Sequence, residues 1–105
     1  MKDETKQKLE ALIRDHRVVV FMKGTRNFPQ CGFSSRAVEA LKRAGAEFET
    51  VNVLADAEVR EGIKELSQWP TIPQVYVDGK FVGGSDIVLQ LFESGDLAKM
   101  VAPKA

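Results

Sequence analysis

The stretch Val18-Val19-Val20-Phe21-Met22 decides the fold expected for this chain of 105 residues. The run is continuously apolar and rich in β-branched residues, which predicts a central strand buried on both faces of a sheet. It is far too short to span a bilayer. Residues 23–30 are expected to form a loop, because Gly24, Asn27 and Pro29 all favour turns.

Helical patterns lie on both sides of this strand. A helix is expected over residues 4–15, and a second helix follows Cys31 and stops near Gly45, a residue suited to the position after a helix end. Within the second helix, Phe33, Ala37, Val38, Leu41 and Ala44 recur at helical spacing. Alternation over residues 48–53 predicts a second strand. Asp56 can cap a third helix.

The second half of the chain contains a hairpin signal. Asp78-Gly79 predicts a tight turn between two short strands, over residues 74–77 and 80–82. Two prolines make residues 69–73 irregular. A fourth helix follows residues 83–86, and its inward side chains are expected to be Ile87, Val88, Leu91 and Phe92.

A short last helix is expected over residues 96–101, so the order of elements is α-β-α-β-α-β-β-α-α. The first β-α-β unit should be right-handed with parallel strands, and the hairpin adds an antiparallel pair. The predicted fold is therefore α/β, a four-stranded mixed sheet with helices on both faces. Residues 1–105 are expected to form one domain.

Composition limits the classes of partner. The 15 basic and 15 acidic residues balance, so no basic field favours nucleic acid, and no run is long enough for a membrane. Neither partner is expected. The single cysteine argues against a secreted disulfide scaffold and for a reducing, intracellular compartment.

That cysteine, Cys31, stands in Pro29-Gln30-Cys31-Gly32-Phe33-Ser34, between the first strand and the second helix. The free N–H groups of a helix start stabilise a thiolate, as would the cation of Lys23. A buried, inert thiol is the alternative, but the neighbouring residues are loop formers rather than core residues. We expect Cys31 to be a nucleophile or a metal ligand that needs a sulfur from outside the chain.

Other polar residues can complete a site around Cys31. Lys23 ends the first strand and could partner a thiolate or a carboxylate. Arg60 and Lys64 share one face of the third helix, where they either meet a ligand or remain in solvent. Ser34 cannot form a disulfide, and it is expected only to bond backbone groups.

Residues 83–86, Gly-Gly-Ser-Asp, form at least a strand exit and a helix cap. The helix N–H groups there could also hold a carboxylate, and Asp86 could instead meet an ammonium group. The extended backbone of Ile72, next to a proline, could hydrogen-bond a peptide-like ligand. With Lys23 and Arg60, this set suits a small zwitterionic peptide with several carboxylates.

Four blocks in order carry a family resemblance that spans nearly the whole chain: Phe21-Met22-Lys23-Gly24, Pro29-Gln30-Cys31-Gly32-Phe33-Ser34, Trp69-Pro70-Thr71-Ile72-Pro73-Gln74 and Gly83-Gly84-Ser85-Asp86. The chain resembles the single-domain monothiol glutaredoxins of the Cys-Gly-Phe-Ser class. Its motifs look most like those of the cyanobacterial and plastid members. The resemblance implies a thioredoxin-like fold, glutathione binding and a bridging 2Fe–2S cluster. It places the chain in a bacterial cytoplasm, or in the plastid stroma for a processed organellar form.

The resemblance also implies roles for single residues. Cys31 would be the nucleophile or the iron ligand. Lys23 and Arg60 would contact the glycine carboxylate of glutathione, with Lys64 as a helper.

On the other side of the ligand, the Ile72 backbone, before a cis Pro73, would pair with the cysteinyl unit of glutathione. Ser85 and Asp86 would hold its γ-glutamyl end. Many family members have cysteine at position 85, so Ser85 removes any second thiol.

Two main functions follow. In the first, a glutathione-dependent homodimer bridges a 2Fe–2S cluster and delivers it to apo-proteins, alongside other assembly factors. In the alternative, the chain is an oxidoreductase that reduces protein–glutathione mixed disulfides through Cys31. A third hypothesis is a sensor of iron or redox state.

Overall fold

The computed structural model describes residues 1–104. The elements follow the predicted order, with one short 3₁₀-helix added after the second strand. Their bounds are α1 Asp3–Asp15, β1 Val18–Met22, α2 Gly32–Arg43, β2 Glu49–Asn52, the 3₁₀-helix η1 Val53–Ala55, α3 Ala57–Ser67, β3 Gln74–Val77, β4 Lys80–Gly83, α4 Ser85–Ser94 and α5 Asp96–Val101.

The four strands form one mixed sheet in the order β2-β1-β3-β4. On β1, Val19 lies opposite Glu49 of the parallel neighbour β2 and opposite Tyr76 of the antiparallel neighbour β3. The β3–β4 hairpin turns at Asp78 and Gly79, whose φ angles are 52° and 79°. Positive φ at both central residues matches the strand twist, which explains the Asp-Gly pair. The predicted four-stranded mixed sheet, with its parallel first pair and antiparallel hairpin, is confirmed.

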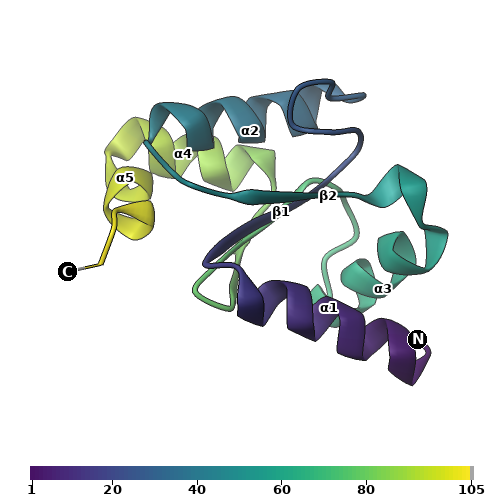
Figure 1. Ribbon diagram of the computed structural model, residues 1–105. Coiled ribbons are helices and arrows are strands. Elements are labelled where there is room, and N and C mark those ends of the chain that lie inside the picture. The colour runs from purple at the N-terminus through teal and green to yellow at the C-terminus, as the bar shows by residue number, and fades with distance from the viewer. Residues whose placement is uncertain (105) are drawn as a thin grey trace.

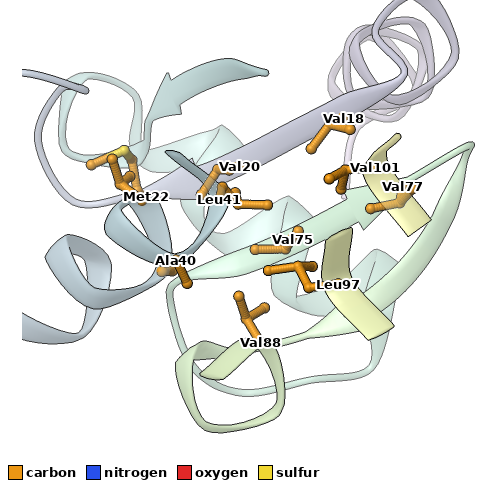
Figure 2. Close-up of a cluster of buried hydrophobic side chains, with 12 residues drawn as sticks. Val18, Val20, Met22, Ala40, Leu41, Val75, Val77, Val88, Leu97 and Val101 are labelled. Carbon is orange, nitrogen blue, oxygen red and sulfur yellow. The ribbon is translucent and has the colours of Figure 1, made fainter. Parts of the chain in front are cut away.

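Helices cover both faces of the sheet, with α2 and α4 on one face and α1 and α3 on the other (Figure 1). Because β1 is central, its side chains point alternately into two cores. Val20 and Met22 pack with Val88 under α2, α4 and α5, as Figure 2 shows. Val19 and Phe21 pack under α1 and α3. All five residues of β1 are buried, as its sequence predicts.

Two apolar residues at helix starts are exposed. Ile87 is 39% exposed, so the prediction that it points inward is wrong, and Phe33 is 53% exposed. Both lie in the first turn of a helix, α2 and α4 respectively. The two side chains line a cavity rather than the core.

The second strand is shorter than expected, because Asn52 ends it. The Asn52 side chain accepts a hydrogen bond from the Leu54 N–H at 3.0 Å, which starts η1 in place of a longer strand. Asp56 caps α3 as predicted, accepting from the N–H groups of Glu58 and Val59. Among residues 1–104, no helix is both long enough and apolar enough to cross a membrane.

Candidate functional site

A cavity of about 510 Å³ lies at the end of the sheet where β1 stops. Its lining comes from the first turns of α2 and α4, from α3, and from residues 69–73. All the predicted site residues line this one cavity: Lys23, Cys31, Arg60, Ile72, Ser85 and Asp86. A wider groove of about 980 Å³, between α1 and the β3–β4 hairpin, contains none of them.

Cys31 occupies the N-cap position of α2 in an extended conformation, with φ −149° and ψ 135°. The backbone N–H of Ser34 is the main group that lowers the pKa of its thiol, against a smaller opposing effect of burial. The Phe33 N–H and the charge of Lys23 lower this pKa further. The thiol is therefore activated toward the thiolate, as the position before a helix predicts.

The backbone of Lys23 is held from several sides. Its N–H donates to the buried hydroxyl of Ser34 at 3.1 Å, and its carbonyl accepts from the Gln30 N–H at 2.9 Å. The next N–H, of Gly24, donates to Asn52 at 3.0 Å. Gly24 has φ +94°, and a Cβ there would lie only 2.5 Å from the Phe28 carbonyl oxygen, so the turn requires glycine. These contacts fix the lysine beside Cys31.

Three cations line the cavity: Lys23 follows β1, and Arg60 and Lys64 come from α3. Within residues 1–104, neither Lys23 nor Arg60 forms an ion pair. The Nε atom of Arg60 is buried and has no hydrogen-bond partner in that part of the chain. Such a donor usually has a partner, so its environment suits an anionic ligand. Lys64 differs, since it contacts Glu61 at 3.5 Å.

Residues 69–73 form one wall of the cavity. The Ile72–Pro73 peptide bond is cis, as the resemblance implies. The Ile72 side chain packs in the core under α1 and α3. No hydrogen bond among residues 1–104 uses the backbone N–H or carbonyl of Ile72. These two groups are therefore available to a ligand with a peptide backbone.

Ser85 and Asp86 are the first two residues of α4. The N-cap is Gly84, without a side-chain cap, so neither residue caps the helix. Ser85 is buried, whereas Asp86 is exposed at the cavity and forms no ion pair within the described residues 1–104. A Cβ on Gly84 would lie 3.3 Å from the Pro73 carbonyl, so this glycine lets α4 approach the opposite wall.

The apolar part of the lining was missed by sequence reasoning. Phe33, Trp69 and Ile87 all line the cavity with substantial exposure. Phe33 and Ile87 belong to helix starts flanked by glycines, and Trp69 stands beside a proline. An aromatic or aliphatic residue at such a helix start or loop, rather than inside a periodic run, was the available signal.

The arrangement suits a zwitterionic thiol ligand. The cations come from the residue after β1 and from α3, and the anion Asp86 comes from α4, which covers the opposite face of the sheet from α3. A ligand with a carboxylate at one end and an ammonium group at the other matches this charge pattern. An activated thiol in the same cavity can attack a disulfide sulfur or bind a metal ion.

Comparisons with known proteins agree with the resemblance read from the sequence. The Glutaredoxin family matches residues 18–82. A protein of Synechocystis, "Uncharacterized monothiol glutaredoxin ycf64-like", is 56% identical over 101 residues, covering 96% of this chain and 94% of that protein. "Monothiol glutaredoxin-S14, chloroplastic" of Arabidopsis thaliana is 49% identical over 98 residues, covering 93% of this chain and 57% of that protein.

A solved structure gives the same result for the fold. The crystal structure of a buckwheat glutaredoxin–glutathione complex matches with a TM-score of 0.82 and 25% identity, covering 96% of this chain and 94% of that one. The predicted thioredoxin-like, glutaredoxin fold is confirmed. The chain belongs to the glutaredoxin family, and within it to the monothiol glutaredoxins.

Proposed function

We propose that the chain binds glutathione in the 510 Å³ cavity, with the ligand sulfur facing Cys31. One observation carries the proposal. A thiol of lowered pKa shares this cavity with Lys23, Arg60 and Asp86, none of which forms an ion pair within residues 1–104. The similar buckwheat glutaredoxin was solved with glutathione bound.

Each end of the ligand has a complementary group. Lys23 and Arg60 bind the glycine carboxylate by charge-assisted hydrogen bonds. The free backbone groups of Ile72 pair with the cysteinyl unit, as an added strand would. Asp86 holds the γ-glutamyl ammonium group, while Ser85 and the first N–H groups of α4 hold the γ-glutamyl carboxylate.

The ligand count extends this proposal to an iron–sulfur cargo. A 2Fe–2S cluster takes four thiolate ligands, and one chain supplies only Cys31. Within residues 1–104, no three His, Cys, Asp or Glu side chains come together as a metal site. Two chains and two glutathiones provide the four thiolates. The chain thus carries the cluster as a homodimer and delivers it to apo-proteins, together with other assembly factors.

The test of the cluster proposal is an absorption spectrum with iron and sulfide analysis. The protein is reconstituted anaerobically, with and without glutathione. We expect the visible absorption of a 2Fe–2S cluster, with equal amounts of iron and sulfide, only when glutathione is present. We expect no cluster in Cys31→Ser. A colourless monomer without iron or sulfide in the presence of glutathione would contradict the proposal.

The lowered pKa of Cys31 favours a second candidate function, reduction of protein–glutathione mixed disulfides. The Cys31 thiolate attacks the glutathione sulfur, and the substrate protein leaves as a thiolate that takes up a proton. The thiolate of a second glutathione then attacks the bound glutathione sulfur. Oxidised glutathione leaves, and the Cys31 thiolate is regenerated. No second protein thiol is needed, which suits a chain with serine at positions 34 and 85.

Turnover of a glutathionylated protein by cluster-free protein tests this second function. A rate above that of free glutathione supports it, and an equal rate removes it. The compartment, bacterial cytoplasm or plastid stroma, stays a prediction, as does the assignment of residues 1–105 to one domain.

A further inference from the structure

The side chain of Gln74, the first residue of β3, is fully buried outside the cavity lining. Its amide nitrogen donates one hydrogen bond to the Trp69 carbonyl at 3.1 Å and one to the Thr71 carbonyl at 3.2 Å. Its amide oxygen accepts from the Tyr76 hydroxyl at 3.4 Å. Every polar atom of this buried side chain therefore has a partner.

Both carbonyls belong to the cavity wall. Trp69 and Thr71 line the cavity, and Ile72 follows directly. Gln74 itself is held by the sheet, where it pairs with Phe21 of β1, the strand that leads to the Cys31 side of the cavity. One amide thus joins an irregular, proline-containing wall to the rigid centre of the fold.

Residues 69–73 belong to no helix or strand. Ile72 packs in the core, and the Trp69 ring lies 5.9 Å from the Phe81 ring, but these contacts do not hold the carbonyls. The Trp69 N–H is held by the end of α3, through the Ser67 hydroxyl at 3.1 Å and the Lys64 carbonyl at 3.2 Å. Without the Gln74 amide, the two part-buried carbonyls would lose their only donor in residues 1–104 and would turn toward water.

We propose that Gln74 is a positioning residue that holds the Trp69–Ile72 wall in the conformation that binds glutathione, an inference that rests on the proposed glutathione site. Gln74 acts through the wall and does not touch the ligand. Its effect should therefore fall on glutathione affinity and leave the Cys31 thiol unchanged.

Two substitutions and one matched control test the role. Gln74→Met keeps an unbranched side chain of similar length but removes both donors, and Gln74→Glu replaces the donating amide by a carboxylate that faces two carbonyls. Tyr76→Phe removes the hydroxyl that reaches Gln74 and leaves the two bonds to the wall. Affinity for glutathione is measured by calorimetry on the full chain, and the pH profile of Cys31 alkylation is measured alongside it.

We expect Gln74→Met to bind glutathione about tenfold more weakly, and Gln74→Glu more weakly still, because each loses two hydrogen bonds that fix the wall. Tyr76→Phe should stay within about twofold of the wild type. In turnover of a glutathionylated substrate, Gln74→Met should raise KM and leave kcat and the alkylation profile unchanged. A general structural defect would lower kcat and shift that profile.

If Gln74→Met binds glutathione as tightly as the wild type does, the positioning role is wrong. That result would leave the proposed glutathione site unaffected. Failure of the wild type to bind glutathione would instead overturn the proposed function. If Gln74→Met does not fold, Gln74→Asn replaces it, since its amide is one methylene too short to keep both bonds. Full affinity in that variant would also contradict the role.

Discussion

The hydroxyl of Ser34 accepts a hydrogen bond from the backbone N–H of Lys23 at 3.1 Å. The bond joins the first turn of α2 to the end of β1, on the two sides of Cys31. The Ser34 side chain is fully buried, and its own backbone N–H is the main group that lowers the pKa of the Cys31 thiol. Ser34 therefore has a structural role in the site, beyond the fact that it cannot serve as a second thiol.

Ser34→Ala should raise the pKa of Cys31, because the Ser34 hydroxyl itself lowers that pKa by hydrogen bonding to the thiolate. The Lys23 N–H also loses its acceptor. The substitution should also lower the free energy of unfolding by about 1–2 kcal/mol, the cost of an unsatisfied buried N–H. The rate of Cys31 alkylation against pH and a urea titration measure the two effects. The control is Ser35→Ala, an exposed neighbour. Equal effects of the two substitutions would contradict the role of Ser34.

The pH dependence of stability follows from the same thiol. The pKa of Cys31 lies below the ordinary 9.0, so folding favours its thiolate. This contribution is complete above the unfolded pKa and is lost as the pH falls through the folded pKa. The difference in unfolding free energy between wild type and Cys31→Ser should therefore be larger above pH 9 than at neutral or acid pH. Urea titrations across this range check the sign, and a difference that grows toward acid would refute it.

Arg60→Gln should weaken glutathione binding at least about tenfold, because a charge-assisted hydrogen bond to a carboxylate is lost. It should leave stability nearly unchanged, since the Arg60 Nε is buried without a partner in residues 1–104. The matched control is Lys80→Gln, which removes an exposed charge of β4 outside the cavity. Calorimetry at low and at moderate salt concentration measures the glutathione affinity of both variants. If the two variants bind glutathione equally, the carboxylate role of Arg60 is wrong.

Asp86→Asn should weaken binding of glutathione but not of an analogue that lacks the γ-glutamyl amino group. Asp86 forms no ion pair within residues 1–104, so its charge is available to the ligand ammonium. The affinities of the wild type and of Asp86→Asn for glutathione and for the analogue form a thermodynamic cycle that isolates this contact. Equal losses for both ligands would show that Asp86 acts on something other than the ammonium group.

Arg17 should matter for stability and not for the site. It donates to the carbonyls of Met100, Val101 and Ala102 at the end of α5, and it contacts Asp78 at 3.0 Å. Arg17→Ala should lower the unfolding free energy by about 2 kcal/mol, since several charge-assisted bonds are lost. Arg14→Ala removes the exposed ion pair with Asp15 and should lower the unfolding free energy by less than about 0.5 kcal/mol. Glutathione affinity should not change in either variant.

The fold was predictable because its signals are local. A run of five apolar residues specifies β1, Asp56 specifies the start of α3, and Asp78-Gly79 specifies the hairpin. Each signal acts within a few neighbouring residues, so the order of elements was enough to predict a mixed sheet with one parallel pair and one antiparallel hairpin. The 3₁₀-helix η1 was not predictable in this way, because it depends on an Asn52 side chain that also binds the distant Gly24 N–H.

The candidate site was predictable only in part. The position of Cys31 before a helix indicated an activated thiol from the residues alone. The residues alone also indicated that Lys23, Arg60 and Asp86 suit a zwitterionic peptide, but only the family resemblance named glutathione and assigned each residue to a part of it. Contacts that support the walls, such as those of Gln74, arise when distant segments meet, and no spacing in the sequence encodes them.

We propose that two chains hold one 2Fe–2S cluster through Cys31 and two glutathiones. Native mass spectrometry of the protein, reconstituted anaerobically with glutathione, measures this composition in one experiment. We expect one species with the mass of two chains, one 2Fe–2S cluster and two glutathiones, absent when glutathione is omitted. A cluster carried by a single chain, a dimeric cluster species without glutathione, or only cluster-free chains would contradict the proposal.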